Sequence, residues 1–195
     1  MEFERIERLP PYVLGVVTEM MLQARKKGED IINLGMGNPD LPTPAPIVAK
    51  LLEAATKTKN HRYSVSRGIL SLRRAICRWY ENRFGISFDP NSEAIATMGA
   101  KEGLSHLILA LVSPGDVVFV PNPTYPIHRY APIIAGADVC DIRLDDQTNF
   151  FENLEQAIKK VGPKGRVLIL SFPSNPTAQV VDLSFFERVV AFAKE

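Results

Sequence analysis

Apolar residues in the first ninety positions recur at intervals of three and four, which is the spacing of an amphipathic helix. We therefore expect three helices in this part of the chain: Val13 to Gly28, Pro44 to Ala55, and Ile69 to Phe84. Thr43 is the expected N-cap of the second helix, because Pro44 then takes the first helical position. The apolar run Ile31–Leu34 predicts a short strand.

From Glu93 onward the pattern changes, and short apolar runs alternate with helical segments. Such alternation indicates βαβ crossovers, so we expect an α/β fold with a mainly parallel sheet and helices on both of its faces. The chain stops inside the last expected helix, where an open sheet rarely ends, so we expect a fragment, incomplete at its C-terminus. The expected strands are 94–98, 117–120, 137–144 and 167–171, and the expected helices are 100–112, 127–134, 152–161 and 184–194.

Composition excludes several classes of protein. The 195 residues are 46% hydrophobic and 23% charged, as in ordinary soluble globular proteins. A net charge of +1 without long basic runs argues against nucleic-acid binding. The chain begins without the apolar core of a signal peptide and has no apolar run long enough to span a membrane. We therefore expect a cytoplasmic protein with no membrane partner, in which Cys77 and Cys140 are reduced.

The loop Thr97–Gly103 leads from an expected strand into an expected helix through small residues. The backbone amides of Ala100 and Lys101 lie at the start of that helix, where the helix dipole is positive. They can therefore hold an anion such as a phosphate group. The alternative is a plain tight turn whose glycines only allow close packing.

Two further strand-to-helix loops are rich in proline. In Pro121–Pro126 the prolines fix the backbone, so the ring of Tyr125 is presented rigidly and suits stacking on a flat heteroaromatic ligand. The alternative is that Tyr125 caps the core. In Ser171–Thr177, Asn175 precedes a proline, which keeps it out of the helical region and makes a cis bond possible. Its amide can donate to a phenolate-like oxygen, unless the pair only marks a turn.

Motifs of other ligand sites are absent. Asp40 stands where a dinucleotide-binding GxGxxG motif needs its third glycine, and no GxxxxGK[ST] segment occurs. The sequence contains neither HExxH nor GxSxG. The three histidines, His61, His106 and His128, are scattered, so we expect each to be a surface or packing residue, and we expect no metal site.

Five segments, taken together and in order, resemble the class I and II aminotransferases, which depend on pyridoxal phosphate and have fold type I. Within that family the chain most resembles the bacterial alanine (glutamate–pyruvate) aminotransferases, with the LL-diaminopimelate and methionine aminotransferases as near relatives. The resemblance implies transamination between an L-amino acid, alanine or glutamate, and a 2-oxo acid. The segments are NLGMGNPD (33–40), HRYSVSRGILSLRRAI (61–76), MGAKEGL (98–104), PNPTYP (121–126) and FPSNPTA (172–178).

The resemblance also assigns roles to single residues. It implies that the amides of Ala100 and Lys101 hold the cofactor phosphate, that Tyr125 stacks on the pyridine ring, and that Asn175 donates to the 3-oxygen of the ring. Asn175 also belongs to the implied substrate site, together with Gly37, whose backbone approaches the carboxylate, and Tyr12. The implied role of Tyr63 is to reach the cofactor phosphate of a partner subunit, so a homodimer is expected.

The resemblance further implies that the Schiff-base lysine lies beyond residue 195, so no catalytic residue is assigned and the chain alone is expected to be inactive. On this reading residues 1–40 form an N-terminal arm and the start of the small domain, and residues 41–195 begin the large, cofactor-binding domain. Two alternatives stay open: a fragment without catalysis, or a binding module of the same fold. Regulators of the latter kind carry a helix-turn-helix domain, yet only about thirty residues precede the NLGMGNPD segment.

Overall fold

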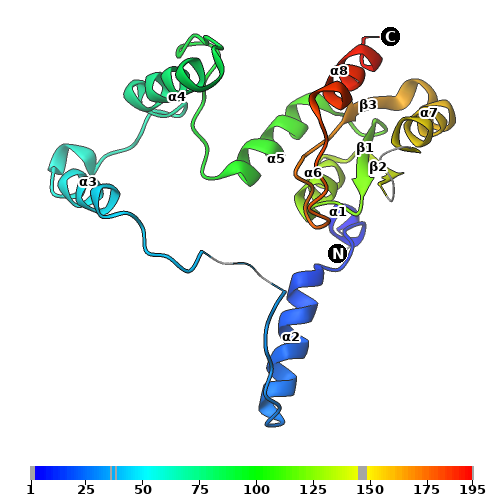
Figure 1. Cartoon of the computed structure of the whole chain (residues 1–195), viewed down its shortest axis with the longest axis horizontal. Helices are drawn as coiled ribbons and strands as arrows, with labels where there is room; N and C mark the ends of the chain where they lie inside the picture. Colours follow the sequence, from blue (N-terminus) through cyan, green and yellow to red (C-terminus); the bar gives the residue numbers. More distant parts are fainter. Residues whose placement is uncertain (1–2, 36, 38, 145–148, 195) are drawn as a thin grey trace. The chain divides into compact units, whose positions relative to one another are not determined.

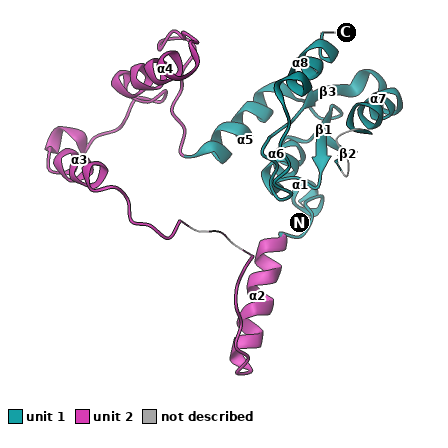
Figure 2. Cartoon of the chain, viewed as in Figure 1, with its two compact units in different colours: residues 1–12, 99–195 teal, residues 13–98 magenta. Residues whose placement is uncertain are grey.

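The computed structural model describes residues 3–35, 37, 39–144 and 149–194, which form two compact units. One unit, called the first unit below, is Val13–Met98 (magenta, unit 2 in Figure 2). The other, called the second unit below, combines Met1–Tyr12 with Gly99–Glu195 (teal, unit 1 in Figure 2). The residues that start the chain therefore fold with its second half. This division does not test the expected boundary at residue 40, which stays a prediction.

All three helices expected in the first unit form. They are α2 (Val13–Lys26), α3 (Ala45–Ala55) and α4 (Leu70–Phe84), with the 3-10 turn η1 (Thr58–Asn60) after α3 (Figure 1). The expected N-cap is wrong, because Pro44 and not Thr43 is the N-cap residue of α3. Pro46 then occupies an early helical position, where the missing amide hydrogen costs no hydrogen bond.

The two strands expected in this unit do not form. Neither Ile31–Leu34 nor Ala94–Met98 pairs with another strand of the described chain. A strand requires a neighbour for its backbone groups, and the amide of Ala96 instead donates to the carbonyl of Arg67 at 3.1 Å. Apolar side chains in both segments are correspondingly exposed, at 91% for Leu34 and 89% for Met98.

Arg73 on α4 is a buried charged residue of this unit. Its guanidinium donates to the carbonyl of Gly68 at 3.1 Å and to the carbonyl of Pro90. These bonds tie the turn before α4 to the loop after it. A buried guanidinium needs such acceptors, because its desolvation is otherwise costly.

The second unit holds a parallel sheet of three strands in the order β2-β1-β3. The chain alternates strands with helices as expected, and β1 lies in the middle, paired in register with β2 from Val117↔Asp138 to Asn122↔Arg143. The strands are β1 (Val117–Asn122), β2 (Asp138–Arg143) and β3 (Gly165–Leu168). The helices are α1 (Glu4–Glu7), α5 (Ala100–Leu111), α6 (Pro126–Ala135), α7 (Phe150–Val161) and α8 (Leu183–Phe192), with the 3-10 turn η3 (Gly162–Lys164) before β3 (Figure 1).

Side chains of β1 alternate between two hydrophobic clusters. Val118 and Val120 pack in the cluster that contains residues of α5 and α6, such as Ile108 and Ala131. Phe119 packs in the other cluster, with residues of α7 and α8. Because successive strand residues point to opposite faces, helices cover both faces of the sheet, which confirms the expected fold class.

Both cysteines are free, as expected, with Cys77 buried and Cys140 partly buried. Within the described residues, no helix combines the length and the apolar character needed to cross a bilayer. The same residues contain no cluster of His, Cys, Asp and Glu suited to a metal ion.

Candidate functional site

Two of the three loops singled out in the sequence lie at one edge of the sheet. β1 ends at Asn122 and leads to Tyr125, the N-cap residue of α6, while β3 ends at Leu168 and leads into the loop that contains Asn175. β1 and β3 are adjacent and parallel, so their carboxyl ends share an edge. Ligands of open α/β sheets bind beyond this edge.

The start of α5 meets the ring of Tyr125. Nζ of Lys101 lies 5.3 Å from the centroid of the Tyr125 ring. A hydrogen-bonding contact with the Tyr125 hydroxyl raises the pKa of Lys101 above its ordinary value. The third loop, read from sequence as an anion site, thus lies beside the aromatic residue that was read as a stacking surface.

The N-cap residue of α5 makes no side-chain hydrogen bond to the start of the helix. Its N-cap residue, Gly99, has φ 90° and ψ 159°, a backbone conformation that suits glycine, and it brings no side chain to cap the amides of Ala100 and Lys101. A Cβ built at Gly99 meets no atom within 4 Å. This end of the helix suits a phosphate group, because the helix dipole is positive here and no atom crowds the N-cap position, although Glu102 places a carboxylate in the same turn.

Tyr125 has a second neighbour in the first turn of α6. The imidazole of His128 lies edge-on to the Tyr125 ring, with centroids 6.1 Å apart and planes at 79°. Nδ1 of His128 is hydrogen-bonded to Oγ1 of Thr124 at 2.8 Å. Burial lowers the pKa of His128 below its ordinary value, so the ring is neutral at pH 7. His128 is therefore a packing residue, as expected, but one that contacts the site.

The N-terminal segment reaches the same region. The Tyr130 hydroxyl on α6 contacts the carbonyl oxygens of Pro10 and Pro11 at 3.2 and 3.3 Å. The rings of Tyr12 and Tyr130 pack at a tilt, with centroids 6.2 Å apart. Tyr12, far away in sequence, is thus held on the helix whose N-cap residue is Tyr125.

Arg8 fixes this segment at a second point. Its guanidinium donates to the carbonyl of Ala137 at 3.0 Å and to Oδ1 of Asp138 at 2.6 Å, at the start of β2. The ion pair is partly exposed, so its own contribution to stability is small. Its geometry still defines where the segment crosses the unit.

Asn175 lies in a closed loop. The amide of Ser174 donates to the carbonyl of Gln179 at 2.8 Å, and the amide of Ala178 donates back to the carbonyl of Ser174 at 2.7 Å. The Asn175–Pro176 bond is cis, as the sequence allowed, and Asn175 itself is exposed while Ser174 is buried. The loop therefore presents the Asn175 amide from a hydrogen-bonded frame.

Gly37 and Tyr63 belong to the other compact unit. A Cβ built at Gly37 meets nothing within 4 Å, and the residues on either side of it lie outside the described residues. Tyr63 is fully exposed and lines a shallow hollow with His61 and Arg62. The roles expected for Gly37 and Tyr63 stay predictions.

Sequence reasoning missed Tyr130 and Arg8. Both contact residues about 120 positions or more away: Tyr130 contacts backbone carbonyls, and Arg8 contacts a backbone carbonyl and the carboxylate of Asp138. Nothing in the local pattern around either residue points to these contacts. His128 was noted in the sequence, yet only the fold shows that it touches Tyr125.

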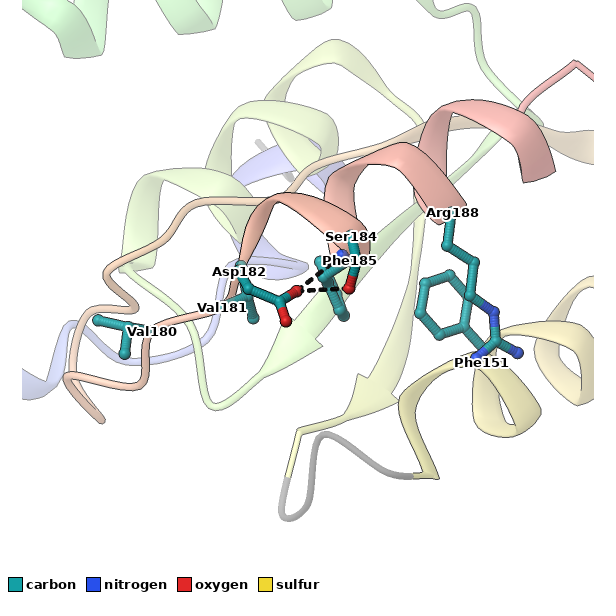
Figure 3. A pocket seen from close by; sticks show the side chains of 7 residues that line it. All are labelled: Phe151, Val180, Val181, Asp182, Ser184, Phe185 and Arg188. Carbon is teal, nitrogen blue, oxygen red and sulfur yellow. Dashed lines mark hydrogen bonds between the residues drawn. The ribbon is translucent and has the colours of Figure 1, made fainter.

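A separate hollow of about 500 Å³ lies beside α8 (Figure 3). Its acidic side chain already has partners, because Oδ1 of Asp182 accepts from the amide of Phe185 at 3.0 Å and from Oγ of Ser184 at 2.8 Å. The guanidinium of Arg188 stacks on the ring of Phe151 at 3.9 Å. These groups stabilise the start of α8 and its packing on α7, and none of the expected site residues lines this hollow.

Comparisons with known proteins agree on one family. A model of the aminotransferase class I and II family matches residues 29–195. Glutamate-pyruvate aminotransferase AlaC of Escherichia coli (strain K12) is 56% identical over 192 residues, which are 98% of this chain and 47% of that protein. LL-diaminopimelate aminotransferase of Dehalococcoides mccartyi (strain BAV1) is 42% identical over 190 residues, 97% of this chain and 49% of that protein.

Solved structures give the same result. The crystal structure of aspartate aminotransferase from Thermotoga maritima matches with a TM-score of 0.86 and 30% identity, over 99% of this chain and 51% of that one. The chain thus spans about half the length of the curated relatives and solved structures that it matches.

Proposed function

The chain belongs to the class I and II aminotransferases, and from that premise we propose that it forms the cofactor-binding part of a pyridoxal-phosphate-dependent transaminase. The observation that carries this proposal is the meeting of Lys101 and Tyr125. This contact supports the proposal because it joins a helix start, whose positive dipole end suits a phosphate, to an aromatic ring, which suits a pyridine. Phosphate and pyridine are the two ends of pyridoxal phosphate.

The proposed roles of the individual residues follow from this placement. The amides of Ala100 and Lys101 hold the phosphate, and the Lys101 ammonium adds positive charge beside it. Tyr125 packs against the ring, held by Lys101 and by the edge of His128. Asn175 donates its amide to the ring oxygen from its closed loop. When bound, the cofactor supplies an electron sink for the amino-acid carbon, and the protein supplies orientation and electrostatics.

Gly37 and Tyr12 are the proposed contacts to the substrate. An absent side chain at Gly37 lets a backbone amide approach a carboxylate. Tyr12 presents its ring from the N-terminal segment and is 47% exposed, so part of its surface is open to a ligand. Tyr63, fully exposed on its own unit, is proposed to reach the cofactor phosphate of a second subunit in a homodimer.

We propose alanine and glutamate, with their 2-oxo acids, as substrates. Support comes from the similarity to glutamate-pyruvate aminotransferase, which exceeds the similarity to LL-diaminopimelate aminotransferase. LL-Diaminopimelate and methionine are the alternative amino donors. The lysine that links covalently to the cofactor is proposed to lie outside these 195 residues, so they are expected to bind the cofactor without turnover.

The test uses pyridoxamine phosphate, which lacks the aldehyde and so cannot form an imine with any lysine. Its binding to the 195-residue chain, measured by equilibrium dialysis, reports the non-covalent site alone. We expect saturable binding of pyridoxamine phosphate, and weaker binding in the Tyr125→Ala variant. Pyridoxamine, which lacks the phosphate, should bind the unchanged chain more weakly than its phosphate does. Tyr80→Ala, which alters an aromatic cluster of the other unit, is the matched control. Equal binding of pyridoxamine and its phosphate would contradict the proposed phosphate site.

Turnover is tested on the longer protein that contains these 195 residues and the proposed cofactor-linking lysine. A panel of amino donors with 2-oxoglutarate or pyruvate is expected to rank alanine and glutamate first. A higher kcat/KM for LL-diaminopimelate or methionine than for alanine and glutamate would contradict the proposed substrates but not the proposed cofactor site. Turnover by the 195-residue chain alone would overturn the placement of the lysine.

A further inference from the structure

The segment Arg8–Tyr12, called the tethered segment below, crosses the second unit and is held there at two separate points. At its first residue, Arg8 bonds to the start of β2. At its other end, the Tyr130 hydroxyl reaches the carbonyl oxygens of two consecutive prolines. The prolines have no amide hydrogen and a fixed φ, so their carbonyl oxygens are the groups by which this stretch of backbone can be held.

Tyr12 follows directly on the tethered prolines. Its ring packs on the ring of Tyr130 at 6.2 Å and 49°, so Tyr130 contacts this segment through both its hydroxyl and its ring. Tyr130 belongs to the same helix as Tyr125, so the segment that it holds ends on the helix that starts at the proposed cofactor site. α6 thus carries Tyr125 at its N-cap and Tyr130 within it.

We propose that Tyr130 is a positioning residue: its hydroxyl tethers residues 8–12 and thereby places Tyr12 at the edge of the substrate site. The expected effect of Tyr130 on substrate binding rests on the proposed function, whereas its contacts with residues 10–12 are part of the fold. Tyr130 does not touch the substrate in this scheme. It acts through Tyr12, so its loss is expected to affect binding of the amino acid more than the chemical step.

The tether is tested first without any activity. Trypsin cleaves the Arg8–Leu9 bond only when the Arg8 side chain is released from Asp138 and Ala137, so the cleavage rate reports the population of the released segment. In Tyr130→Phe the ring stays and only the hydroxyl is lost. Losing one hydrogen bond of ordinary strength raises that population about two- to tenfold. Cleavage after Lys27, an exposed residue of the other unit, is the internal reference.

Two further variants control this result. Tyr80→Phe removes a tyrosine hydroxyl from the aromatic cluster of α4 and is expected to leave cleavage after Arg8 unchanged. Asp138→Asn cuts the ion pair of Arg8 without touching Tyr130 and is expected to release the segment as well. Cleavage after Arg8 at the wild-type rate in Tyr130→Phe would overturn the tether.

The functional consequence is measured on the active protein. Tyr130→Phe is expected to raise KM for the amino donor about two- to tenfold, with kcat within about twofold of wild type. A merely structural role would lower the amount of active enzyme and reduce kcat instead. An unchanged KM, alongside faster cleavage after Arg8, would overturn the link to substrate. A wild-type protein without any turnover would overturn the proposed function, whereas the tether is judged by the cleavage rates.

Discussion

The ammonium of Lys101 and the ring of Tyr125 meet beyond the carboxyl end of β1, with Nζ 5.3 Å from the ring centroid, although they stand at the starts of different helices. Lys101 stands in the first turn of α5 and Tyr125 is the N-cap residue of α6. The two helices share a hydrophobic cluster with β1, which fixes the position of both helix starts. The contact is therefore a consequence of core packing, and it assembles the phosphate and ring ends of the proposed site.

Replacing Lys101 by Met should weaken the binding of pyridoxamine phosphate several-fold without abolishing it. The backbone amides that face the phosphate remain in the variant, and only the ammonium charge and its contact with Tyr125 are lost. Lys101→Arg keeps the charge and should bind more tightly than Lys101→Met. Equilibrium dialysis at low and high salt tests whether the charge is the cause. The difference in affinity between the two variants should shrink as salt screens the charge.

The pH dependence of this contact has a definite sign. The pKa of Lys101 is raised from its ordinary value of 10.5, so the contact favours the protonated form. Its contribution is fully present below that ordinary value and is lost as the pH rises through the raised one. The affinity ratio between wild type and Lys101→Met should therefore stay constant from neutral pH to about pH 10. A ratio that falls already near pH 8 would contradict the contact.

The central part of the second unit was predictable from the sequence because its signals are local. Alternating strand and helix patterns gave β1, β2, β3 and the helices α5 to α8 to within a few residues, and prolines fixed the loop that presents Tyr125. The strand expected at Ala94–Met98 failed because pairing depends on a neighbour that no local pattern can reveal. The contacts of Tyr130 could not be predicted for a related reason, since its partners are backbone oxygens about 120 positions earlier in the chain.

His128 should make the stability of the second unit depend on pH. Burial lowers its pKa from the ordinary value of 6.5, so the unfolded chain binds a proton more readily than the folded one. Stability is thus complete above about pH 6.5 and falls as the pH drops toward the lowered pKa. His128→Gln should flatten this part of the profile. Urea midpoints between neutral pH and about pH 5 measure it, with the exposed His61→Gln as the control that should keep the wild-type slope.

The cluster on the α7 side of the sheet should tolerate truncation poorly. Leu154 is fully buried there between residues of β1, β2 and α8. Leu154→Ala should lower the free energy of unfolding by about 2–5 kcal/mol, because the truncation removes buried surface and leaves a cavity. Leu183→Ala, at a position that is 72% exposed on α8, should change it by less than about 0.5 kcal/mol. Comparable losses in the two variants would show that Leu154 is not in a packed core.

Two glycines with nearly the same positive φ should respond differently to alanine. Gly28 has φ 83° and Gly68 has φ 81°, so each variant pays a similar strain for placing a Cβ in the left-handed region. A Cβ at Gly28 meets no atom within 4 Å, whereas at Gly68 it lies 2.5 Å from Cβ of Ala96.

Gly68→Ala must therefore displace the loop that accepts the bond from Arg73 and that pairs Arg67 with Ala96. We expect it to destabilise the unit Val13–Met98 by at least about 1–3 kcal/mol more than Gly28→Ala, the range typical of overpacking. Urea unfolding followed by the fluorescence of Trp79, the single tryptophan of the chain, measures that unit directly. The double variant Gly68→Ala with Ala96→Gly removes the clashing methyl and should restore most of the difference. Equal destabilisation by the two single variants would mean that Ala96 does not approach Gly68 in solution.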